Sequence, residues 1–147
     1  KPPFKTNFGA SIKQGGRKSG LAGYYFHLEP GSSFVGGGLW MPEAPALKAV
    51  RQEIDYNWDE FQAIIQAKDF KKVFGGVYRS SDVSLSTVPK GYEKDNPAID
   101  YLKLKSFIAE TTITDEELTT ASLHKKTVAA FEALQPLLQF INRALTD

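Results

Sequence analysis

The fold is decided by the stretch AGYYFHLE-PGSS-FVGGGLW, which occupies residues 22–40. In its first segment, apolar residues alternate with Tyr25, His27 and Glu29, and a period of two is typical of a β-strand with two unlike faces. Residues 30–33 carry turn signals, and residues 34–40 return as another apolar strand. Two strands separated by so short a turn predict an antiparallel hairpin.

The segment before the hairpin predicts a further strand. From Phe4 to Ile12 the side chains alternate again, which places the apolar ones on one side of a half-buried strand. The residues between this strand and the hairpin, 14–23, include four glycines among polar neighbours. Such a composition indicates a mobile loop.

After the hairpin the spacing becomes helical. Pro45 suits a first helical turn. Apolar side chains then recur at three- and four-residue steps, at Leu47, Val50, Ile54 and Trp58. A second helix capped by Asn57 or Asp59 is expected next, and a long irregular connection should run from Tyr78 to Gly91.

The remaining third of the chain mixes one strand with helices. We expect a short helix over about 95–104, a strand over 106–112, and a short helix opened by the capping-box spacing that begins at Thr114. Ser122 can cap the last and longest helix. Pro136 lies inside its apolar pattern, so a kink or break near Ala133 is expected.

These elements predict an α+β fold in which an antiparallel sheet packs against several helices and the C-terminus is helical. The chain has 147 residues, of which 41% are hydrophobic, and this is enough for one domain over residues 1–147 with a real core. It has no Cys, which excludes disulfides and thiolate metal sites, and no apolar run of membrane-spanning length. We therefore expect a cytoplasmic protein that neither enters a membrane nor needs a cofactor.

The net charge of +1 hides an asymmetry along the chain. Residues 1–28 hold five cations and no acid, whereas the rest holds 13 cations and 17 acids. A basic segment of this kind suits a phosphate, a nucleic acid or an acidic partner. It can equally be a solvated basic edge.

Few residues point to catalysis. The two histidines, His27 and His124, show no metal-ligand spacing, so no metal site is expected. His27 shares its strand face with Tyr25 and Glu29, which makes it the one weak candidate for proton transfer. The glycines at 36–38 fit no phosphate-binding motif, and they indicate either close backbone packing or a floor beneath a ligand.

Five stretches carry a resemblance to a known family. They begin with KPPFKTNFG at residues 1–9, continue with GYYFHLEPG at 23–31 and GGGLWMP at 36–42, and extend to PKGY at 89–92 and DNPA at 95–98. In this order they resemble the DUF2461 family, whose function is uncharacterised. The resemblance covers nearly the whole chain.

The family pattern places an arginine-rich stretch and preceding helices before the residues that match Lys1, Lys5 and Asn7. The resemblance therefore implies that this chain is the larger C-terminal part of a DUF2461-like domain and that an upstream segment packs on it. Two residues depart from the pattern: Phe4 stands where relatives usually carry Tyr, and Asn96 stands where they often carry His. If either family residue does chemistry, this chain lacks it or achieves it otherwise.

Three functions stay open. The first is a binding domain with an anion- or phosphate-binding basic face, for which the candidate ligand-binding residues are Lys1, Lys5, Asn7, Tyr25 and Lys90. The second is an enzyme that acts on a phosphorylated or nucleic-acid substrate through His27. The third is a protein-interaction domain whose basic edge contacts an acidic partner.

Overall fold

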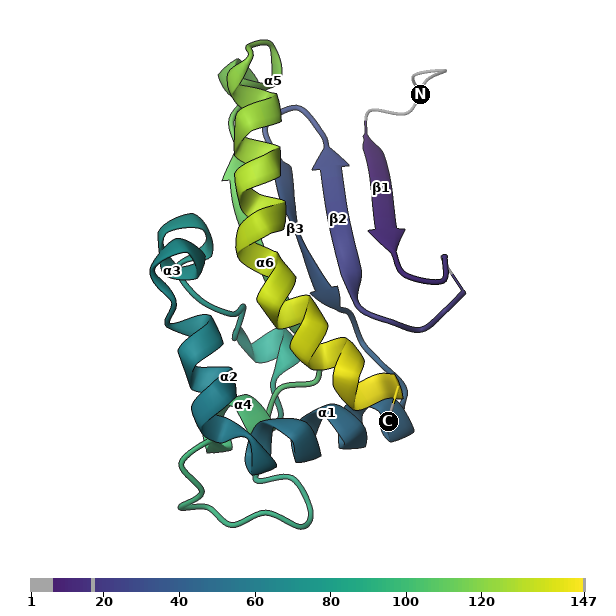
Figure 1. Cartoon of the computed structure of the whole chain (residues 1–147), viewed down its shortest axis with the longest axis vertical. Coiled ribbons are helices and arrows are strands. Elements are labelled where there is room, and N and C mark those ends of the chain that lie inside the picture. The colour runs from purple at the N-terminus through teal and green to yellow at the C-terminus, as the bar shows by residue number, and fades with distance from the viewer. Residues whose placement is uncertain (1–6, 17, 147) are drawn as a thin grey trace.

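A computed structural model describes residues 7–16 and 18–146 of the chain. Its centre is a four-stranded antiparallel sheet in the order β1-β2-β3-β4 (Figure 1). The strands are β1 (Phe8–Lys13), β2 (Gly23–Leu28), β3 (Ser33–Leu39) and β4 (Phe107–Ile113). The hairpin expected from residues 22–40 is thus confirmed as β2 and β3, and the Ser32 N–H closes its turn by donating to the Glu29 carbonyl at 2.7 Å.

The long helix α6 (Ser122–Thr146) covers one face of the sheet (Figure 1). The alternation within β2 decides which side chains meet it: Tyr24 points to this face, and its ring lies 4.4 Å from that of Phe131 on α6. Val35 and Leu39 of β3 are buried on the same side. Part of the core of the protein therefore lies between the sheet and α6, and the rest lies between α6 and the helices described next.

Three helices follow the hairpin and complete this layer. They are α1 (Ala44–Tyr56), α2 (Trp58–Ile65) and α3 (Lys68–Phe74), and each packs against α6. A Pro lies in the first turn of α1, and its Val50 and Ile54 are buried, as the three- and four-residue spacing predicts. Arg143 near the end of α6 links this helix to α1 and α2, because its guanidinium donates to Glu53 of α1 and Glu60 of α2.

The connection from 75 to 98 contains a 3-10 turn, η1 (Ser81–Val83), and an isolated β-bridge from Ser84 to Leu104, and it leads into α4 (Ile99–Leu102). Beyond β4, Thr114 caps α5 (Asp115–Leu118) in the expected capping box: the Glu117 N–H donates to the Thr114 hydroxyl, and the Thr114 N–H donates to the Glu117 carboxylate. The predicted α+β class is confirmed. Within the described ranges, no helix is long and apolar enough to span a membrane.

Two expectations need correction. α6 does not break at Pro136, because Leu137, Leu138 and Ile141 beyond it are buried and their packing holds the helix together. The kink that was the other expected outcome stays a prediction. The first strand is not half-buried on its apolar side, since Phe8 and Ile12 are 59% and 61% exposed. α6 crosses the sheet over β3 and leaves β1 beside it (Figure 1).

Candidate functional site

The face of the sheet opposite α6 carries a groove, and the strand register builds it. On this face, three cross-strand rows run from β1 to β4. One row is Lys13, Gly23, Gly38 and Ile108; the next is Ser11, Tyr25, Gly36 and Glu110; the third is Gly9, His27, Phe34 and Thr112. In the first row, two glycines stand side by side in the middle of the sheet, so no side chain fills the space above them.

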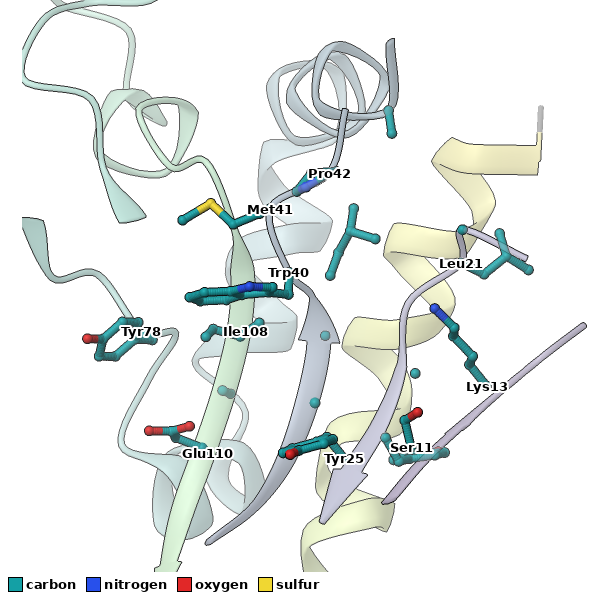
Figure 2. Close-up of a pocket in the computed structure, with 18 of the residues that line it drawn as sticks. Ser11, Lys13, Leu21, Tyr25, Trp40, Met41, Pro42, Tyr78, Ile108 and Glu110 are labelled. Carbon is teal, nitrogen blue, oxygen red and sulfur yellow. The ribbon is translucent and has the colours of Figure 1, made fainter. Parts of the chain in front are cut away.

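The groove above this glycine row has a volume of about 1030 Å³. Figure 2 shows Trp40 and Met41 along one side of it and Tyr25 and Glu110 along the other. Trp40 is 60% exposed although it is one of the largest apolar side chains in the chain. Met41 beside it is 43% exposed and has a φ of +41°, an uncommon value for a residue other than glycine. The groove thus has an aromatic wall that faces solvent.

Backbone contact explains why Gly38 in this row and Gly36 in the next row are glycines. A Cβ atom at Gly38 would collide with the Phe107 carbonyl oxygen of β4, and one at Gly36 would collide with the Ala109 carbonyl oxygen. The close approach of β4 therefore requires glycine at both positions. This agrees with close backbone packing, one of the two explanations that the sequence left open. The same absence of side chains leaves Gly38 in the floor of the groove.

Among the residues that the structure describes, acidic groups outnumber basic ones around the groove. Glu43, Asp82 and Glu110 line it together with one described cation, Lys13. The Tyr78 hydroxyl donates to Asp82 at 3.1 Å, whereas the Glu110 carboxylate has no hydrogen bond or ion pair within residues 7–16 and 18–146. Loss of water raises the pKa of Glu110, and His27 nearby opposes part of the shift. A cation at this place would relieve the cost of the partly desolvated charge.

A hydrogen-bonded chain of side chains runs along β2 on the same face. His27 Nε2 lies 3.0 Å from the Glu29 carboxylate, and His27 Nδ1 lies 3.2 Å from the Tyr25 hydroxyl. An ionised carboxylate only accepts, so Nε2–H donates to Glu29 and Nδ1 accepts from Tyr25 when His27 is neutral. The ring of Phe34 stacks on His27 with centroids 5.0 Å apart. The chain could carry a proton between Glu29 and the groove, and a catalytic role for His27 stays a prediction.

The predicted ligand-binding residues do not all share this groove. Tyr25 lines it, and Asn7 is exposed immediately before β1. Lys1 and Lys5 lie outside the described residues. Lys90 is exposed on the connection between η1 and α4, which lies next to α1 and away from β1 and β2 (Figure 1). The anion-binding role of these five residues therefore stays a prediction.

The structure gives Asn96 a structural role. Its Nδ2 donates to Asp55 of α1 at 2.8 Å, and its Oδ1 accepts from the Ala98 N–H at 2.8 Å, so it fastens the connection to the helix. Arg51, one turn before Asp55, donates to the Leu104 carbonyl at 3.1 Å, and burial lowers the pKa of Arg51. Burial and the Asp55 carboxylate raise the pKa of Tyr92 in the same cluster. The PKGY and DNPA segments thus meet on α1.

In the part of the chain that the structure describes, no three His, Asp or Glu side chains come together as metal ligands. Glu110, Asp82 and Trp40 were not among the site residues predicted from the sequence. The register could have indicated Glu110, since Tyr25 and Gly36 lead directly to it across the sheet. Tyr78 and Asp82 reach the groove from an irregular connection, for which a sequence pattern gives no direction.

Comparison with known proteins gives one family. A family model described as "Conserved hypothetical protein (DUF2461)" matches residues 1–140. No curated protein and no solved structure matches the chain.

Proposed function

This chain belongs to the DUF2461 family, and we propose that it is a binding domain whose groove on the open face of the sheet holds the arginine side chain of a peptide segment. The observation that carries this proposal is Glu110, a carboxylate without a partner in the described structure, opposite the exposed indole of Trp40 (Figure 2).

The chemistry of the groove favours a guanidinium group. Arginine stacks its planar head on aromatic rings and also forms paired hydrogen bonds with a carboxylate. Trp40 and Tyr25 supply the rings, and Glu110 and Glu43 supply carboxylates along the same hollow. A lysine ammonium could use the charge, but it lacks the flat surface that matches an aromatic wall.

The dimensions favour a segment rather than a single small molecule. Lys13 and Ile108 stand at opposite ends of the glycine row, three strand spacings or about 14 Å apart. That length accommodates about four residues of extended chain. Lys13, which forms no ion pair in the described structure, then meets an acidic group at the other end of the segment.

The segment has two possible sources. The family resemblance implies an arginine-rich stretch upstream of this chain, and that stretch could fold back into the groove. A separate protein could also supply the arginine. The chemistry of recognition is the same, and the experiment below separates the two sources.

The anion-binding function expected from the sequence is the second candidate. One observation favours it: Lys13 lines the groove at the end next to the basic segment. In this case inorganic phosphate would bind near β1, and Lys13→Ala would abolish its binding.

The test is calorimetric titration with the capped pentapeptide Gly-Ser-Arg-Ser-Gly. We expect Glu110→Gln and Trp40→Ala each to weaken binding about tenfold or more, the cost of about 1.4 kcal/mol or more for a lost charged or stacked contact. Glu93→Gln, an exposed change on the remote connection, is the matched control and should bind as the unmodified protein does. The same peptide with neutral citrulline should bind far more weakly.

Equal binding of the citrulline peptide, or equal binding by Glu110→Gln, would refute the proposal. Binding of phosphate but not of the arginine peptide would support the second candidate. If a longer form of the protein that includes the upstream stretch no longer binds the added peptide, the stretch itself occupies the groove.

A further inference from the structure

The two edges of the sheet differ in how they are covered. Next to β4, the Tyr78 N–H donates to the Ile108 carbonyl at 2.8 Å, and the Lys105 N–H just before β4 donates to the Val83 carbonyl at 2.7 Å. The connection from 77 to 84 therefore lies against that edge. β1 stands at the other edge, and no strand among residues 7–16 and 18–146 pairs with its outer side (Figure 1). An edge of this kind presents unpaired backbone N–H and C=O groups.

The helix side of β1 is apolar and uncovered. Phe8 pairs with Leu28 and Ile12 pairs with Tyr24, which places both on the face that α6 covers further along the sheet. There they are 59% and 61% exposed, the two most exposed large apolar side chains of the sheet strands. One more strand beside β1 would give both side chains a neighbour at the cross-strand distance of about 5 Å.

The charge near this edge indicates which kind of peptide strand can pair with β1. Among the described residues before Glu29, Lys13 closes β1, Lys18 follows in the next loop, and no acid is present. A second copy of this chain would bring a second Lys13 and Lys18 to the edge, and lysine at an edge disfavours such pairing. An acidic strand would instead meet complementary charge.

We propose that the free edge of β1 accepts an extended acidic peptide as a fifth strand, with apolar and acidic residues alternating along the peptide. The apolar residues lie on the helix side beside Phe8 and Ile12. The acidic residues lie on the other side, near Lys13. β1 has six residues, so a partner segment of about six residues matches its length. Lys13 also lines one end of the groove, but the outer edge of β1 and the pair Phe8 and Ile12 do not line it, so the inference does not depend on the arginine proposal.

The experiment measures fluorescence anisotropy of a labelled, capped hexapeptide in which valine and glutamate alternate. Saturable binding is expected, with about tenfold weaker affinity for a Phe8→Ser/Ile12→Ser double variant. Both side chains are mostly exposed, so the double variant should fold, which circular dichroism checks. Phe8→Leu/Ile12→Val is the matched control and should retain most of the affinity.

Two altered peptides test the two parts of the recognition. A peptide methylated on alternate backbone nitrogens cannot complete the ladder and should lose binding, and one with lysine in place of glutamate should also lose it. Equal binding of the lysine peptide or of the methylated peptide would overturn the proposal. Concentration-dependent dimers in sedimentation that dissociate in the double variant would also overturn it, because β1 would then pair with a second copy.

Discussion

Gly38 shows how one missing side chain shapes both the sheet and the groove. Its φ is +130°, and a Cβ there would collide with the Phe107 carbonyl oxygen on β4. We expect Gly38→Ala to destabilise the protein by about 2–4 kcal/mol, because the strained backbone and the displaced strand both add to the cost. Urea denaturation measures the change in the free energy of unfolding.

Gly31→Ala is the matched control for this prediction. Gly31 also has a positive φ, +79°, but nothing lies within 4 Å of a Cβ placed on it. Its substitution should cost only the left-handed backbone penalty of about 1–2 kcal/mol. Equal costs at the two positions would show that β4 can move away from Gly38, and the close packing of the glycine row would then be wrong.

The raised pKa of Glu110 predicts how the stability of the protein changes with pH. Burial raises the pKa of Glu110 in the folded protein above its unfolded value. The folded state therefore holds the proton more tightly than the unfolded state does. The free energy of unfolding falls as pH rises from the unfolded pKa through the folded pKa. Glu110→Gln removes this loss, so the variant should melt at a higher temperature than the unmodified protein at pH 7.

The gain of Glu110→Gln should disappear below about pH 4, where the unmodified carboxyl is protonated in both states. Differential scanning calorimetry at the two pH values checks it. Glu93→Gln, on an exposed site with no resolved interaction across the groove, serves as the comparison. A gain of the same size at both pH values would mean that the effect does not come from the charge of Glu110.

At the scale of elements, α6 presents a proline in the middle of a continuous helix. Pro136 is exposed and cannot donate a hydrogen bond to the carbonyl of residue 132. Pro136→Ala should therefore stabilise the protein by about 1–2 kcal/mol, part of the helix-propensity difference being offset by the greater freedom of the unfolded chain. Chemical denaturation measures it, with the exposed neighbour change Gln135→Ala expected to be close to neutral. No gain would mean that the helix is bent too far at Pro136 to form the bond.

The elements themselves were largely predictable from the sequence. The hairpin, α1 and the capping box at Thr114 depend on neighbouring residues in the chain, so their local patterns were sufficient. The uninterrupted α6 was not predictable, because the packing of Leu137, Leu138 and Ile141 offsets a local signal for a break. The exposure of Phe8 and Ile12 was also missed, since alternation shows which side of a strand is apolar but not whether a helix covers it.

At the scale of the whole molecule, the asymmetry of the layers sets the function that we propose. Within the described ranges, the α-helices lie either on the α6 side of the sheet or past the ends of its strands (Figure 1). The main core lies with them, and the opposite face of the sheet stays open and carries the groove. The sequence indicated a basic region for ligand binding, but the fold brings Glu43, Asp82 and Glu110 from three separate segments to the groove. Convergence of distant residues of this kind has no signature in a single sequence, and this explains why the three carboxylates were not among the predicted site residues.

The groove above Gly23 and Gly38 is proposed above all as a binding site for a guanidinium group. The most direct measurement is a titration of ¹⁵N-labelled protein with the arginine pentapeptide, followed by two-dimensional NMR. Saturable shifts are predicted for the amides of Gly38 and Glu110 and for the indole N–H of Trp40, and they should be absent with the citrulline peptide. Shifts confined to the connection at 84–98, or no shifts at any peptide concentration, would contradict the account.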